Sequence, residues 1–343
     1  GGQTFISPSD IIDERGDEDI CPWARSKVLP HIDAQDVIDL RNDFEAFKAQ
    51  ITQQPTEIVT VGSGGDFANI NEALKYLSQR HARFWQEGYT AEIMLLSGFV
   101  MEEQVFVEGL DLGWITITSQ SSEVTINREA LTRSVEIIFP GGISSERYPA
   151  FAGIDGATLP IIDVLFNMNT SGEASQRDGF LVADNSNLII KPGGGIENVG
   201  IGSSSGTTAP HGILATGNSR VTATRGVFSG CTLGVGAHFG SSVVLTQANI
   251  SGAIFNPVFI SFGSRLSASN ANLSNGGMDG VTVLYNSTAN LYDANISGCG
   301  GLGLYVVEGS VVNADQAYLV NNGFGGILNH SSFVSANSAN TRV

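Results

Sequence analysis

Apolar residues recur along the C-terminal half of this chain with a period of 22 to 23 residues. Phe228, Ile250, Leu273, Ile296 and Leu319 follow one another at separations of 22, 23, 23 and 23 residues. A second series keeps the same step and begins successive apolar segments: Gly212, Gly234, Pro257, Gly280, Gly303 and Gly326. A fixed period of this length is typical of a solenoid, in which each unit covers the apolar face of its neighbour.

The segments within each period predict strands. The stretches 243–246 and 281–284 are short, rich in β-branched residues and alternating in polarity. We therefore expect an all-β fold, a single-stranded parallel β-helix in which equivalent residues of successive coils lie about 4.8 Å apart. Such a solenoid presents a long lateral surface.

Two segments precede the expected solenoid, which we place at 55–343. Residues 1–30 are acidic and irregular, with Pro8, Pro22 and Pro30. Residues 31–54 predict a helical neck, because its apolar positions step by 3, 4, 3 and 4 residues from Val37 to Ile51. An amphipathic helix packed on the solenoid and a short trimeric coiled coil both fit this pattern.

The solenoid is expected to begin with a strand near Val59–Val61, a glycine-rich turn and a helix from Ile70 to Arg80. The turn lacks the lysine and the spacing of a phosphate-binding loop. A helix that covers the open end of the β-helix is the better interpretation, since an uncovered end exposes unpaired strand edges. Residues 140–180 interrupt the rhythm, which predicts a long excursion or irregular coils, a common place for function on a regular scaffold.

The net charge of −17 argues against nucleic acid and anionic membranes as partners. Acids are concentrated before residue 200, whereas residues 201–343 hold four acids and four arginines. Neutral sugars and neutral or basic protein surfaces remain open as partners. No apolar stretch has the length of a membrane span, so we expect no membrane insertion.

Cysteine and histidine placement predicts neither a disulfide framework nor a metal site. Cys231 and Cys299 lie 68 residues apart, at equivalent positions three coils apart. This places them about 14 Å from each other, too far for a disulfide. No two of the five histidines have the spacing of metal ligands. We expect no metal and no cofactor.

Candidate catalytic residues lie in the irregular region. Hydrolysis of a glycosidic bond needs two carboxylates about 5–9 Å apart, and no two acids of the regular coils share a ladder position. Asp178 and Asp184 bound a short apolar segment, residues 179–183, and are the pair we assign if the protein is an enzyme. Ordinary surface charge is the alternative interpretation.

Aromatic residues also form a series, one per coil. Phe239, Phe262 and Tyr285 occupy equivalent positions, and we expect the two phenylalanines in the core, where flat rings stack well at this spacing. For carbohydrate binding we assign Tyr285, Tyr292, Tyr305 and Arg177. Asn249, Asn272 and Asn295 predict a ladder of side-chain amides at a turn.

The stretch from Val59 to Leu77 resembles the opening of the β-helix domain in bacteriophage tailspikes and related virion spike proteins. A short strand, a Gly-Gly-Asp-Phe turn and an Asn-Glu-Ala-Leu helix start carry the resemblance, and residues 109–118 are similar to the early coils of that group. The resemblance implies a right-handed, pectate-lyase-like β-helix and a homotrimeric spike on the surface of a phage or phage-like particle. The N-terminal segment would contact other virion proteins, and the solenoid would contact polysaccharide of the host surface.

Three functions fit these expectations. The sequence favours a non-enzymatic adhesin that binds host polysaccharide. The alternatives are a polysaccharide depolymerase (a glycoside hydrolase or lyase) and a structural spacer or adaptor of a phage-like particle. Two departures from the family stand out: no aspartate cluster suited to the calcium of pectate lyases is present, and the sequence ends within a repeat, without the C-terminal trimerisation module usual in tailspikes.

Overall fold

The computed structural model describes residues 41–42, 57–80, 90–139, 141–169, 176–201 and 209–340. The chain divides into two compact units, Gly1–Pro55 and Thr56–Val343. In the first unit only Arg41 and Asn42 are described, and both are helical. The irregular segment predicted for 1–30 and the rest of the neck predicted for 31–54 therefore lie outside the described residues.

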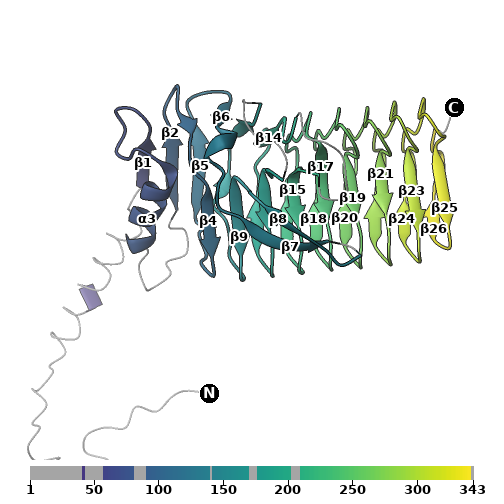
Figure 1. The fold of residues 1–343 in the computed structure, drawn as a ribbon, viewed down its shortest axis with the longest axis horizontal. Helices are drawn as coiled ribbons and strands as arrows, with labels where there is room; N and C mark the ends of the chain where they lie inside the picture. The colour runs from purple at the N-terminus through teal and green to yellow at the C-terminus, as the bar shows by residue number, and fades with distance from the viewer. Residues whose placement is uncertain are drawn as a thin grey trace, which may run out of the picture. The chain divides into compact units, whose positions relative to one another are not determined.

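The second unit is a parallel β-helix whose chain winds through three walls, with equivalent segments of successive coils side by side in each wall (Figure 1). The first wall is a nine-stranded sheet. In spatial order it contains β25 (Ile327–His330), β23 (Leu304–Val307), β21 (Val281–Val283), β19 (Val258–Ile260), β17 (Leu233–Ala237), β15 (His211–Ala215), β12 (Phe180–Val182), β9 (Phe151–Ile154) and β4 (Val105–Glu108).

The second wall is formed by a four-stranded sheet that continues, through isolated bridges, into a seven-stranded sheet. The four strands are β1 (Glu57–Val61), β2 (Ala91–Leu95), β5 (Ile115–Ser119) and β10 (Ile161–Ile162). The seven are β13 (Asn187–Ile189), β16 (Arg220–Thr222), β18 (Ser242–Val244), β20 (Arg265–Ser267), β22 (Thr288–Asn290), β24 (Val311–Asn313) and β26 (Phe333–Ser335).

The third wall begins as a four-stranded sheet and ends as a series of single bridges. Its strands are β3 (Val100–Met101), β6 (Val124–Ile126), β11 (Leu165–Asn167) and β14 (Gly195–Glu197). The bridges then run through Val227, Asn249, Asn272, Asn295, Tyr318 and Asn340. The predicted amide ladder is confirmed here, since Asn272 Nδ2 donates to Asn249 Oδ1 at 3.0 Å and Asn295 Nδ2 donates to Asn272 Oδ1 at 3.3 Å.

The helix predicted for Ile70 to Arg80 is present with those bounds, as α3 (Ile70–Arg80). Ile70, Ala73 and Leu77 are fully buried in the core of the solenoid. The Glu103 carboxylate accepts the backbone N–H groups of Ile70 and Asn71 at 2.5 and 3.0 Å. This contact satisfies the first amides of the helix and ties α3 to the early coils.

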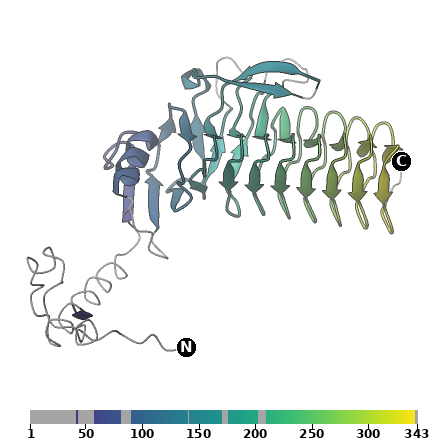
Figure 2. The ribbon, with the colours of Figure 1, turned by 90° about the horizontal axis from the view of Figure 1, so that it is seen from below.

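The excursion predicted for 140–180 is a β-hairpin that starts earlier and is shorter. The antiparallel strands β7 (Val135–Phe139) and β8 (Ile143–Arg147) follow the short 3₁₀ helix η2 (Arg128–Ala130). The regular coils resume at β9. In Figure 2 the hairpin lies along the outside of the solenoid, and its Ile137 and Phe139 pack on Ala152, Leu181 and Leu214 of the nine-stranded sheet.

The glycine series that begins the apolar segments has a steric cause. At Gly280 a Cβ atom would meet Ile296 Cγ2 inside the core and would lie 2.6 Å from the carbonyl oxygen of Gly303 in the next coil. Gly212 and Gly303 are confined in the same way, because a Cβ at either would lie 2.7 or 2.8 Å from the carbonyl oxygen of the following coil. At these three glycines successive coils thus approach too closely for a Cβ atom.

We expect Gly280→Ala to lower the free energy of unfolding by about 3 kcal/mol, because the added methyl group overpacks the core. Urea unfolding followed by circular dichroism measures this change. Gly263→Ala is the matched control, since its site has positive φ (73°) but open space around the Cβ, and we expect a cost of only about 1 kcal/mol from backbone strain. Equal losses in the two variants would contradict the steric explanation.

Candidate functional site

We call the outward side of the seven-stranded sheet the seven-stranded face. It is polar at its centre, and exposed apolar side chains lie toward its two ends, at Ile189, Val311 and Phe333. The central residues of its strands, such as Val243 and Leu266, point into the core and are buried. Their neighbours on either side point outward. At the first outward position the register brings Arg220, Ser242, Arg265 and Thr288 side by side. Hydroxyl and guanidinium groups thus line a surface with a repeat of about 4.8 Å.

A stack of aromatic rings borders this face at the turn where each coil passes from the nine-stranded to the seven-stranded sheet. The ring centroids of Phe239 and Phe262 are 5.2 Å apart, and those of Phe262 and Tyr285 are 4.4 Å apart. We call these three residues the aromatic file. The expectation that the phenylalanines point into the core is wrong: both are half-buried at the surface, and Tyr285 is 37% exposed.

The backbone of the turn explains why the rings point outward. Each file residue has a left-handed conformation, with φ of 52° at Phe239, 54° at Phe262 and 53° at Tyr285, and the residue after it is left-handed too. Two consecutive left-handed residues make a tight turn that directs the first side chain away from the core. The two pairs of stacked rings offset part of the strain, since aromatic pairs contribute roughly 0.5–1.5 kcal/mol each.

Inside the same turn, hydrogen bonds between buried serines link neighbouring coils. Ser219 N donates to Ser241 Oγ at 3.2 Å, and Ser287 N donates to Ser310 Oγ at 3.3 Å. All four serines are nearly or fully buried. The turn that carries the aromatic file is therefore held from within.

Two of the tyrosines assigned to carbohydrate binding lie on either side of one strand. Tyr285 precedes β22 and Tyr292 follows it, so they occupy opposite borders of the seven-stranded face. Tyr292 is 40% exposed, and its hydroxyl donates to Gln316 Oε1 at 2.8 Å. Tyr305 lies instead in β23, on the outward side of the nine-stranded sheet. Arg177 lies with its guanidinium 4.3 Å from the centre of the Tyr148 ring, at the base of the hairpin.

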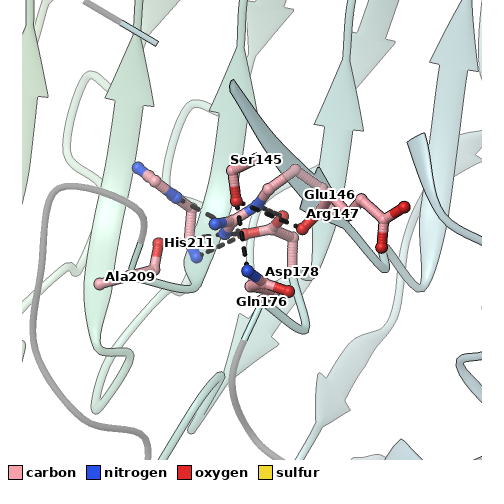
Figure 3. Close-up of polar contacts among 7 residues, drawn as sticks. All are labelled: Ser145, Glu146, Arg147, Gln176, Asp178, Ala209 and His211. Carbon is pink, nitrogen blue, oxygen red and sulfur yellow. Dashed lines mark hydrogen bonds and ion pairs between the residues drawn. The ribbon is translucent and has the colours of Figure 1, made fainter. Parts of the chain in front are cut away.

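Asp178, assigned above as a candidate catalytic residue, lies in a buried ion pair under the hairpin (Figure 3). Arg147, at the end of β8, donates from Nε to Asp178 Oδ2 at 2.6 Å and from a terminal nitrogen to Oδ1. The same guanidinium donates to the carbonyl oxygen of Ala209 at 3.0 Å, and His211 N donates to Asp178 Oδ1 at 2.7 Å. Neither side chain of the pair has any exposed surface.

This ion pair anchors the hairpin to the solenoid. A two-stranded hairpin is only marginally stable without packing, and Arg147 joins it to the strands that follow Asp178 and Ala209. Burial alone would raise the pKa of Asp178, but the Arg147 guanidinium and the hydrogen bonds from His211 and Arg147 outweigh it and lower the pKa to about 2. Without movement of the hairpin, a polysaccharide cannot reach this carboxylate. The catalytic assignment of Asp178 stays a prediction.

Two buried histidines extend the cluster. Phe139 of the hairpin contacts the rings of His211 and His238, with centroids 6.0 Å away in each case. His238 Nδ1 is hydrogen-bonded to Ser261 Oγ at 2.8 Å. Burial lowers the pKa of His238 to about 3, with a smaller contribution from His211. Burial also lowers the pKa of His211, although the neighbouring Asp178 opposes the shift.

Asp184, the second candidate catalytic residue, lies at the outer turn and is exposed. Its register partner in the preceding coil is Asp155, since Gly156 N donates to the Asp184 carbonyl oxygen at 2.7 Å. The Cα atoms of the two aspartates thus share a ladder position about 4.8 Å apart. Asp178 and Asp184 lie at opposite ends of β12, so the structure pairs Asp184 with Asp155 rather than with Asp178.

Among the described residues, no three histidine, cysteine, aspartate or glutamate side chains gather in an arrangement that could hold a metal ion. Cys231 and Cys299 are free and buried, as expected from their spacing. None of the helices in the described part of the chain is long and apolar enough to cross a membrane.

The sequence analysis did not predict the buried cluster around Arg147 and Asp178, and it did not single out the outward side of the seven-stranded sheet as a candidate site. Arg147, His211 and His238 share no sequence spacing, because a hairpin and two separate coils bring them together. The side on which the aromatic file points could have been inferred, since Gly240, Gly263 and Asn286 follow its three members and favour left-handed turns.

We expect acid to destabilise the protein through its buried histidines. A histidine whose pKa is lower in the folded state stabilises the fold fully above its unfolded pKa of about 6.5, and this contribution is lost as the pH falls towards the folded value. For His238 the loss between pH 7 and pH 5 is about 2 kcal/mol. The contribution of Asp178 is lost only below about pH 4, in a separate range.

Urea unfolding at pH 7 and pH 5 measures this loss in the parent protein and in His238→Gln. The variant is expected to show a clearly smaller difference between the two pH values, because it has no imidazole to protonate at that position. His330→Gln, at an exposed histidine, serves as the control and should keep the parent difference. An unchanged pH dependence in His238→Gln would contradict the explanation.

Comparison with known proteins agrees with the architecture. Residues 211–343 match the family model described as "right handed beta helix region", so over these residues the chain is a right-handed parallel β-helix. Among solved structures, the periplasmic alginate epimerase AlgG is similar at 10% identity and a TM-score of 0.35, covering 78% of this chain and 83% of that chain. A mutant of AlgG gives 10% identity and a TM-score of 0.36, covering 79% and 83%. A search of curated protein sequences found no match.

Proposed function

We propose that this protein is a virion spike adhesin that binds a cell-surface polysaccharide along the seven-stranded face. The observation that carries the proposal is the aromatic file beside a row of hydroxyl and guanidinium groups. Sugar rings have apolar faces that pack on aromatic side chains and hydroxyl groups that exchange hydrogen bonds with polar ones. A face with a regular repeat suits a ligand that is itself a regular polymer.

The choice of this face over the nine-stranded sheet rests on its accessibility and chemistry. The hairpin covers part of the outward side of the nine-stranded sheet with apolar side chains. The seven-stranded face carries exposed side chains at its first outward position from Arg220 onward, apart from the half-buried Ser242. Tyr285 and Tyr292 border it on two sides. We keep Tyr305 and Arg177 as predicted contacts that would belong to a different surface.

The assignment to a virion, the homotrimer and the attachment through the N-terminal segment rest on the resemblance of residues 59–77 to virion spike proteins. The strand, turn and helix of that stretch are present as β1 and α3, which supports the proposal at the level of local structure. In this proposal the acidic segment 1–30 contacts other virion proteins, and the solenoid extends from the particle surface.

We expect Phe262→Ala and Tyr285→Ala to weaken binding to polysaccharide extracted from the host surface by about tenfold each, because each removes a ring on which a sugar packs. Affinity electrophoresis of the full chain in gels that contain the polysaccharide measures this loss. Tyr318→Ala is the matched control, since Tyr318 is 49% exposed but lies on the third wall, and it should bind normally. Normal binding by both file variants would overturn the proposal.

Light scattering on the same samples gives the number of subunits, expected to be three.

A depolymerase remains the second candidate because of the Asp155 and Asp184 pair. Retaining glycosidases hold two carboxylates about 5 Å apart, close to the spacing of neighbouring coils. If the protein is such an enzyme, Asp184→Asn and Asp155→Asn should each abolish the release of new reducing ends from host polysaccharide, while Asp163→Asn should not. Release of reducing ends that persists in both variants would exclude this pair, and absence of release by the parent protein would leave the adhesin.

A further inference from the structure

The seven-stranded face contains a positively charged area in a strongly acidic protein. The whole chain carries −17, yet residues 198–278 contain no aspartate and no glutamate. Their basic side chains are Arg220, Arg225 and Arg265, all three exposed. The three arginines lie on or beside β16 and β20 and therefore on one face.

The register places these arginines around three adjacent strands, β16, β18 and β20. Arg220 and Arg265 share the first outward position with Ser242 between them, which separates their Cα atoms by about 9.6 Å. Arg225 follows the other end of β16, where its Nε donates to Gln247 Oε1 at 2.8 Å. Phe239 and Phe262 border the same strands. We call this area the arginine patch.

The patch is electrostatically unsatisfied. Among the described residues, the ion pairs join Arg147 and His211 to Asp178 and Lys191 to Asp163, and none includes Arg220, Arg225 or Arg265. Within the described part of the chain, the side chains of the three arginines make one hydrogen bond, from Arg225 to the neutral amide of Gln247. Exposed acids lie instead at the two ends of the turn series that carries the aromatic file, at Asp184 and Glu308. A negative ligand is thus attracted to the patch and repelled beyond it.

We propose that the arginine patch binds an acidic polysaccharide, with sugar carboxylates paired to Arg220 and Arg265 and sugar rings packed on the aromatic file. This inference rests on the proposed glycan-binding function and adds the charge class of the ligand. A planar guanidinium donates two parallel hydrogen bonds to the two oxygens of a carboxylate, an arrangement that a hydroxyl group cannot reproduce. The hydroxyl groups along β18 and β20 would contact the uncharged parts of the polymer.

The charge density of the patch favours a glycan over a nucleic acid. Duplex DNA carries a negative charge about every 1.7 Å along its axis, so a bound duplex would extend over Asp184 and Glu308 as well as over the arginines. A polysaccharide with one carboxylate per one or two sugars has sparser charges, and three arginines on three coils can match them.

The experiment measures binding of the full chain to acidic polysaccharides (polygalacturonate, alginate, hyaluronan and polysialic acid), to carboxyl-reduced polygalacturonate, to the neutral polymers dextran and galactomannan, and to duplex DNA. We expect binding to at least one acidic polysaccharide, with an affinity that falls as salt rises. Arg220→Gln and Arg265→Gln should each weaken it roughly fivefold, and Arg133→Gln, an exposed arginine beside Phe106 and far along the chain from the patch, should not.

Each outcome bears on the inference. Loss of binding on carboxyl reduction, together with the effect of the two patch variants, supports it. Binding to a neutral polymer alone, with Tyr285→Ala defective, overturns the acidic ligand and leaves the proposed function standing. If the parent protein, Arg220→Gln and Arg265→Gln all fail to bind any glycan of the panel, the acidic ligand and the proposed glycan-binding function are both overturned. Tighter binding to DNA than to every glycan would overturn the inference and assign the patch to nucleic acid.

Discussion

The in-register stacking of coils is the constraint on which the rest of this structure depends. Each strand pairs in parallel with its equivalent one coil away, as Val235, Val258 and Val281 do in the nine-stranded sheet. Because the backbone path is similar in successive regular coils, equivalent residues tend to adopt the same conformation and to meet similar neighbours. The glycines that begin the apolar segments, the buried serines and the left-handed turns are three consequences of this requirement.

The same repetition arranges side chains for recognition. A residue that the turn forces outward in one coil is forced outward in the next, so Phe239, Phe262 and Tyr285 form a continuous stack at the surface. Arg220 and Arg265 are placed by the same logic at the first outward position of their strands. A regular polymer can meet such a surface at several equivalent points, which allows many weak contacts to act together.

In the irregular part of the chain, the hairpin has a structural role. An interruption of a regular scaffold is a common place for function, but here the hairpin of residues 135–147 packs on the nine-stranded sheet and is held by Arg147 and Asp178. It closes one side of the solenoid with apolar contacts and a buried ion pair. In contrast to the nine-stranded sheet, which the hairpin partly covers, the seven-stranded sheet exposes the polar side chains of its outward side to solvent. In this protein the period itself builds the candidate site.

The sequence by itself determined the architecture, because the spacing of Phe228, Ile250 and Leu273 reflects a period that each coil must keep to bury its neighbour. It also predicted the helix α3 from the local pattern of residues. The repeat spacing placed Cys231 and Cys299 too far apart for a disulfide. Only the tertiary structure decided that Asp184 shares a ladder position with Asp155 and that Asp178 is buried beneath Arg147. The physical reason is that sequence periodicity specifies which residues are equivalent, whereas exposure depends on turn conformation and on what covers each wall. A hairpin that folds back over distant coils leaves no periodic trace in the sequence.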